Sequence, residues 1–157
     1  MIDAKRRILL KGSLAAGAVG VAVGAGLLAP RVVLAAWPEA AFKAESVDDA
    51  LNALLGSNTH EASDTIKIKA PDIAENGAVV PVTVESDAEG ISSISIIASG
   101  NQTPLIASFD LGAGAIGFVS TRIKMAKTAE VVAVVKAGDK IMSSAKEVKV
   151  TIGGCGG

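Results

Sequence analysis

A single cysteine set among glycines is the residue best suited to chemistry in this sequence. It is Cys155, the only cysteine of 157 residues, in the run Gly153-Gly154-Cys155-Gly156-Gly157. A lone cysteine cannot form an internal disulfide, and glycines offer no side chains that could bury a thiol. Because glycine also loses much conformational entropy on ordering, we expect residues 153–157 to form a flexible C-terminal arm with an exposed thiol.

The dimensions of this arm suit the delivery of a bound group. Extended backbone spans ~3.3–3.6 Å per residue, so the segment from Gly153 to Cys155 can place the sulfur roughly 10 Å beyond the last strand. Nothing beside Cys155 in the sequence lowers its pKa from that of an ordinary thiol, so we expect partner proteins to activate it. The pattern predicts a covalent carrier. The alternatives are an accidental terminal thiol and an interchain disulfide.

Residues for other kinds of chemistry are sparse. The one histidine, His60, is expected to be a solvated residue of the connector 58–64. The acidic residues show no calcium-loop spacing, and the glycine-rich segments lack the lysine and Ser/Thr of a phosphate-binding loop. The sequence therefore predicts no metal site, no cofactor and no enzymatic turnover by this chain alone.

The first 36 residues have the pattern of an export signal. The paired Arg6 and Arg7 precede residues 12–29, which are uncharged and rich in Gly and Ala, and Ala35-Ala36 suit signal peptidase. We expect a twin-arginine signal over 1–36 and a periplasmic protein with no stable membrane association after cleavage. The alternative is a permanent anchor, since this uncharged stretch approaches the ~20 residues that span a bilayer.

The charge of the remaining chain excludes nucleic acid as a partner. Residues 1–36 contain five basic residues and one acidic residue, so their removal changes the formal net charge from −1 to −5. Nucleic-acid binding requires clustered Lys and Arg, and no basic tract remains. We expect residues 37–152 to form one domain.

One short amphipathic helix is predicted near the start of this domain. Apolar residues from Val47 to Leu55 repeat at helical spacing, Ser46 can cap the first turn, and Gly56 can end the helix. We expect the helix to pack on one end of a sheet domain. Docking against a partner is the alternative.

The rest of the domain has the two-residue periodicity of strands. We expect eight of them, at 65–69, 79–85, 91–98, 105–111, 116–124, 130–136, 141–144 and 146–152, with a loop within 112–117. Short strands separated by turn residues favour an immunoglobulin-like antiparallel β-sandwich. Pro81 predicts an edge or a bulge. The apolar faces of residues 94–97 and 131–135 are expected to be core, with contact to a partner protein as the alternative.

Several segments resemble a known family. They are the Ala-Pro-Asp-Ile-Ala-Glu-Asn-Gly of 70–77 running into Val-Val-Pro-Val at 79–82, Thr-Arg-Ile-Lys-Met at 121–125, and 148–157, whose Gly-Gly-Cys-Gly-Gly ending is the most specific. With the twin-arginine signal, they resemble the SoxY family, the sulfur-binding subunit of the SoxYZ carrier in bacterial thiosulfate oxidation.

The resemblance implies a cycle in which Cys155 holds the cargo and Gly153, Gly154, Gly156 and Gly157 form its arm. The cytochrome complex SoxXA couples thiosulfate to the thiol, SoxB hydrolyses the terminal sulfone as sulfate, and SoxCD oxidises the remaining persulfide sulfur. A second β-sandwich, SoxZ, is implied as a heterodimer partner. Because twin-arginine export moves folded cargo, we hypothesise that SoxZ crosses the membrane already docked to this chain.

Two further readings of the sequence predict different roles. In a ubiquitin-like sulfur carrier, the carboxylate of Gly156-Gly157 would be activated by nucleotide in the cytoplasm, and the export signal disfavours this. In a secreted adhesion or scaffolding β-sandwich, Cys155 would be incidental or would link two copies through a disulfide, since a fold alone does not determine function.

Overall fold

The computed structural model of this chain describes residues 37–153, which belong to one compact unit. The expected export signal at 1–36 and residues 154–157 lie outside the described residues, so that domain division stays a prediction. Two helices precede a series of strands: α2 (Glu39–Lys43), α3 (Val47–Leu55), β1 (Glu61–Ala62), β2 (Ile66–Lys69), β3 (Ile73–Asn76), β4 (Val80–Ser86), β5 (Ile91–Ala98), β6 (Leu105–Asp110), β7 (Gly117–Ile123), β8 (Ala129–Ala137) and β9 (Lys140–Ile152).

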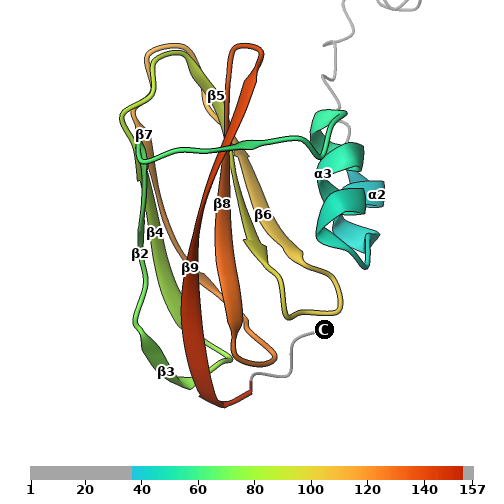
Figure 1. The fold of residues 1–157 in the computed structure, drawn as a ribbon, viewed down its shortest axis with the longest axis vertical. Helices are drawn as coiled ribbons and strands as arrows, with labels where there is room; N and C mark the ends of the chain where they lie inside the picture. The colour runs from blue at the N-terminus through green and yellow to red at the C-terminus, as the bar shows by residue number, and fades with distance from the viewer. Residues whose placement is uncertain (1–36, 154–157) are drawn as a thin grey trace, which may run out of the picture. The chain divides into compact units, whose positions relative to one another are not determined.

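The strands form two facing sheets, as Figure 1 shows. The larger sheet has the order β1-β9-β8-β5-β6, with β3 also paired to β9, and the smaller has the order β2-β4-β7. The ladders β8–β9, β5–β8, β5–β6, β2–β4 and β4–β7 are antiparallel. The expected immunoglobulin-like β-sandwich is confirmed.

Two strands and one helix were not predicted. Both missed strands, β1 and β3, run parallel to β9, and their side chains are mostly exposed. Such short polar segments have no two-residue alternation, so only pairing with a distant strand makes them extended. The missed helix, α2, is only five residues long.

One predicted break in a strand is wrong. The separate strands expected at 141–144 and 146–152 are the single strand β9, because Ala145 pairs with Val132 without a shift of the ladder. A continuous partner strand, β8, keeps the backbone of Ala145 extended. The end of β9 is therefore a continuation of the same strand that pairs with β8 in the larger sheet.

The core lies between the sheets. Its fully buried members include Ile94 and Ile96 on β5 and Val131 and Val135 on β8, so the expected core at 94–97 and 131–135 is confirmed. Burying each Val or Ile side chain contributes ~1.5–3 kcal/mol. The two most central strands thus hold the sandwich together.

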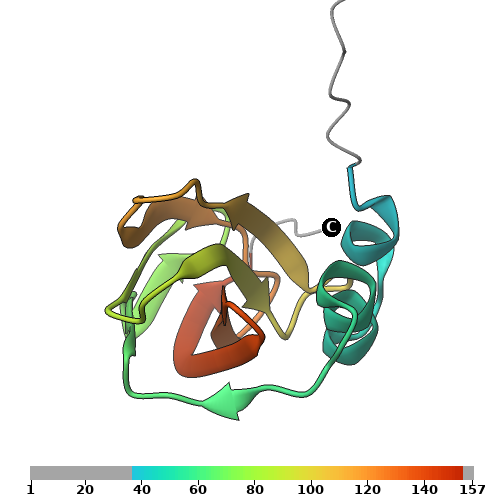
Figure 2. The same cartoon turned by 90° about the horizontal axis from the view of Figure 1, so that it is seen from above.

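The helices cover the outer face of the larger sheet, where Leu51 packs with Ile97, Leu105 and Val134. Figure 2 shows both helices beside this sheet. Packing against one end of the sheet domain was the expected position, and that prediction is wrong: β8 is apolar on both faces and β5 carries Ile97 on its outer face, so the outer face of the sheet also needs cover.

The predicted ends of α3 are confirmed. Ser46 Oγ accepts the Asp49 backbone N–H at 3.1 Å and so caps the first turn. At the other end, Gly56 has φ 78°, and its N–H donates to Asn52 O at 3.0 Å. A positive φ at this position favours glycine. Local chemistry therefore decides where this helix begins and ends.

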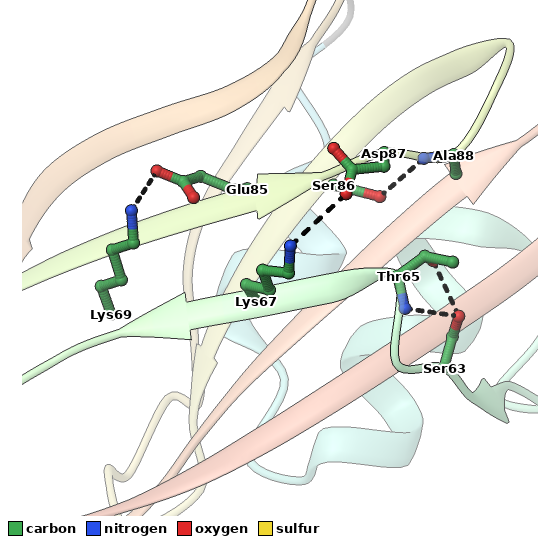
Figure 3. Close-up of polar contacts among 8 residues, drawn as sticks. All are labelled: Ser63, Thr65, Lys67, Lys69, Glu85, Ser86, Asp87 and Ala88. Carbon is green, nitrogen blue, oxygen red and sulfur yellow. Dashed lines mark hydrogen bonds and ion pairs between the residues drawn. The ribbon is translucent and has the colours of Figure 1, made fainter.

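Pro81 occupies a locally free edge, as predicted. The strand β4 is central in the smaller sheet, but β2 pairs with it only from Thr83 to Ser86, so at Pro81 only β7 flanks it. Where β2 does pair with β4, two exposed lysines of β2 form ion pairs with acids at the end of β4 (Figure 3). Lys69 pairs with Glu85 at 2.6 Å, and Lys67 pairs with Asp87, just after β4, at 3.6 Å. The expected loop within 112–117 is also present.

Candidate functional site

The strand that leads toward Cys155 is held in the sheet as far as its last residue. The antiparallel ladder with β8 ends where Ala129 pairs with Val148. Beyond that point β3 takes over, because the next residues of β9, up to Ile152, pair with it in parallel. The Gly77 N–H then donates to Ile152 O at 2.8 Å. The backbone is therefore fixed at Ile152, the last residue before the predicted arm.

The loop between β7 and β8 supports this end of β9. The Met125 N–H donates to Gly77 O at 2.7 Å, and the Met125 side chain is fully buried in the core. In the same loop, Thr128 Oγ1 accepts the Val150 N–H at 2.9 Å. The loop is thus bonded to β9 through the Thr128 side chain and to the turn before β4 through the Met125 backbone.

Asn101, in the turn between β5 and β6, holds the same loop from its other side. Its Nδ2 donates to Lys124 O at 2.8 Å, and its Oδ1 accepts the Ala126 N–H at 2.8 Å. The carbonyl oxygen of Ala126 faces Gly153 so closely that a Cβ on Gly153 would overlap it. We call Gly77, Asn101, Met125, Ala126, Ile152 and Gly153 the arm root.

Two exposed cations lie beside the arm root. Lys124 and Lys127 lie on either side of the Met125-Ala126 step, and both are exposed. None of the ion pairs formed within residues 37–153 involves either lysine. The loop therefore adds positive charge beside the start of the arm, which suits an anionic cargo.

The structure brings together segments that lie far apart in the sequence. Residues 73–77 pair with or bond to the end of β9, Met125 of the segment 121–125 bonds to Gly77, and residues 80–82 pair with 121–123 beside them. These are the segments on which the family resemblance rests, together with 148–157. The resemblance is therefore concentrated around the strand end that leads to the arm.

Only one of the predicted site residues lies within the described part of the chain. It is Gly153, which is exposed and packs against Ala126. The other predicted residues lie outside the described residues, and their roles stay predictions: Cys155, Gly154, Gly156, Gly157, Arg6 and Arg7. Sequence reasoning interpreted Gly153 as a flexible link and did not anticipate that it meets a neighbouring backbone.

Asn101 and Gly77 were missed as site residues. Both stand in turn signals, Gly100-Asn101 and Asn76-Gly77, and nothing in the sequence indicates that these two turns bond to the same loop. His60 is exposed, as expected, and its Nδ1 lies 2.7 Å from Ser143 Oγ.

The described residues form neither a cluster suited to a metal ion nor a membrane-spanning helix. No group of three or more His, Cys, Asp or Glu side chains within 37–153 is arranged to hold a metal ion. Across the same residues, no helix is long and apolar enough to cross a membrane.

Comparison with known proteins assigns a family. Residues 51–155 match the model of the sulfur oxidation protein SoxY. Among solved structures, the chain is similar to the sulfur carrier protein SoxY from Chlorobium limicola f thiosulfatophilum, with 48% identity and a TM-score of 0.63, over 68% of this chain and 97% of that one.

A more distant likeness is to a superoxide reductase (neelaredoxin) from Ignicoccus hospitalis, with 19% identity and a TM-score of 0.49 over 55% of this chain and 79% of that one. That likeness carries no functional argument. No curated protein matches the chain. The family match covers most of the domain and extends to Cys155. The chain therefore belongs to the SoxY family of sulfur carrier proteins in sulfur oxidation.

Proposed function

We propose that this protein holds sulfur intermediates covalently on the thiol of Cys155 and presents them to other proteins of the sulfur oxidation system. The observation that carries the proposal is the SoxY family match, which extends to Cys155. The arm root supports it, because the backbone is held up to Gly153 and the thiol follows two residues later. From there a sulfur atom can reach roughly 10 Å outward.

The chemistry requires partners. Coupling thiosulfate to the thiol forms a sulfur–sulfur bond and releases one proton and two electrons, which a cytochrome such as SoxXA would accept. Hydrolysis of the resulting S-thiosulfonate, the step of SoxB, consumes one water and releases sulfate, leaving a persulfide on Cys155. SoxCD would then remove six electrons from the outer sulfur, which takes its three oxygen atoms from three waters, and a second hydrolysis would release sulfate and return the free thiol. The chain supplies the attachment atom and its arm.

We propose further that the protein works in the periplasm as a heterodimer with SoxZ. The periplasmic location is supported by the paired Arg6 and Arg7 before an uncharged Gly/Ala-rich stretch. The heterodimer with SoxZ is supported by membership of the SoxY family. Replacing both arginines by lysine should stop export of this chain and of docked SoxZ, measured by immunoblotting periplasmic and cytoplasmic fractions. Continued export of SoxZ in this variant would rule out export as a docked pair.

The covalent proposal is tested by the intact mass of mature protein purified from cells oxidising thiosulfate. We expect sulfur-containing adducts that a reductant removes and that are absent from Cys155→Ser. Protein purified without thiosulfate in the medium is the matched control. A bare thiol in the wild-type protein, or only a disulfide-linked homodimer, would contradict the proposal and favour a scaffolding role.

A further inference from the structure

Asn101 links the turn between β5 and β6 to the loop between β7 and β8. Both polar groups of its side-chain amide bond to the loop backbone, at Lys124 O and at the Ala126 N–H, each at 2.8 Å. The amide nitrogen can only donate and the amide oxygen can only accept, so the two bonds hold two separate points of the loop backbone, at Lys124 and at Ala126. Neither bond involves a residue of the predicted arm.

The loop that Asn101 holds is in turn bonded to the end of β9. The Met125 N–H donates to Gly77 O at 2.7 Å, and the Gly77 N–H donates to Ile152 O at 2.8 Å. A continuous path of hydrogen bonds therefore runs from the Asn101 side chain through the loop to Ile152. The last residue of β9 is positioned by this path as well as by the strand ladder.

Direct contact completes the arrangement at Gly153. A Cβ at this residue would overlap the Ala126 carbonyl oxygen, so the loop and the start of the arm touch backbone to backbone. The turn that carries Asn101 is equally close to its neighbours, since a Cβ at Gly100 would lie 2.6 Å from the Ala129 Cβ. Movement of the loop toward Gly153 or toward this turn is therefore blocked by direct contact.

We propose that Asn101 is a positioning residue for the carrier arm: it holds Ala126 against Gly153 and so sets the direction in which the chain leaves β9. The proposal rests on Cys155 being the attachment site. Because only Gly154 separates Cys155 from Gly153, the direction of the chain at the root decides which region the sulfur samples. A misplacement of ~1 Å can lower the rate of a reaction between positioned groups by ~10²-fold.

The variant Asn101→Ala removes both bonds to the loop. Ser120→Ala is the matched control, because it removes one side-chain hydrogen bond, to Thr83 Oγ1 at 2.9 Å, on strand pairs that do not form the arm root. Asn101→Ala should lower the melting temperature more than Ser120→Ala, because it removes two hydrogen bonds and the control removes one. Gly153→Ala provides a second perturbation of the same contact without removing a side-chain hydrogen bond.

The direct readout is a distance distribution between two nitroxide labels on the mature chain. One label is placed on Cys155 and the other on Glu89→Cys, in the turn between β4 and β5 at the far end of β4 from the arm root. Pulsed electron paramagnetic resonance should give a broader and shifted distribution for Asn101→Ala and for Gly153→Ala, and an unchanged one for Ser120→Ala. If Asn101→Ala does not fold, Gly153→Ala decides the question. Distributions that match the parent protein in the folded variants would overturn the proposal.

A chemical readout separates this proposal from the carrier role itself. In cells oxidising thiosulfate, the rate at which Cys155 gains reductant-removable sulfur should fall about 10-fold or more in Asn101→Ala. Alkylation of the purified protein by iodoacetamide should not change, because a small reagent needs no fixed arm direction. Absence of sulfur adducts from the wild-type protein would count against Cys155 as carrier. Equal loading of wild type and Asn101→Ala would count against the positioning role alone.

Discussion

Replacing Met125 by alanine tests whether core packing holds the loop at the arm root. The Met125 side chain is 0% exposed and belongs to the cluster between the sheets. Truncating a buried methionine to alanine costs ~2–5 kcal/mol, a large share of the ~5–15 kcal/mol that stabilises a typical domain. The backbone bond from Met125 to Gly77 remains in the variant, so the loss of stability reports the packing of the side chain.

Urea unfolding followed by far-UV circular dichroism measures this loss. With an m-value of ~1–3 kcal/mol per M, a loss of about 3 kcal/mol lowers the midpoint by roughly 1–3 M. Met142→Ala is a matched control, because it makes the same truncation at a residue of β9 that is only partly buried, and its shift should be smaller. Met125→Leu should cost less than ~1.5 kcal/mol. Equal midpoints for the two alanine variants would refute the reasoning.

Three further predictions address the arm, the helix and the surface. Cys155→Ser should abolish reductant-removable sulfur without changing the melting temperature, since a thiol exposed as the sequence predicts would add no packing; a lower melting temperature would contradict the predicted exposure of the thiol. Ser46→Ala should lose ~1 kcal/mol in urea unfolding because the Asp49 N–H loses its cap, and an unchanged midpoint would exclude that role. Lys69→Met should cost at most ~1 kcal/mol, less in high salt, because its ion pair with Glu85 is largely solvated; a clearly larger, salt-independent loss would show that this pair has a structural role.

Local patterns in the sequence predict much of this fold. The helix over Val47–Leu55 follows from apolar spacing between Ser46 and Gly56, and each end is decided by a residue that bonds within one turn. The strands from β4 to β8 follow from alternation between turn residues. In these elements the interactions that choose the local structure lie within a few residues, so a single sequence contains them.

Non-local pairing is where such prediction fails. The strand β3 is short and mostly exposed, and it is extended because it pairs with β9, more than seventy residues later. The helices lie over the outer face of the larger sheet because Val132 and Val134 of β8 and Ile97 of β5 make that face apolar as well. Alternation predicts which side chains share a face, but it does not predict which strands become neighbours or what covers the second face.

The sequence by itself determined the chemical group of this protein, a lone thiol among glycines, and the class of fold that carries it. Only the tertiary structure decided that Asn101, Ala126 and Gly153 come together at the base of the arm. These residues are more than twenty positions apart from one another, and their contacts depend on how four chain segments pack at one end of the sandwich. A local sequence pattern cannot predict these contacts, because they form only when the two sheets pack together.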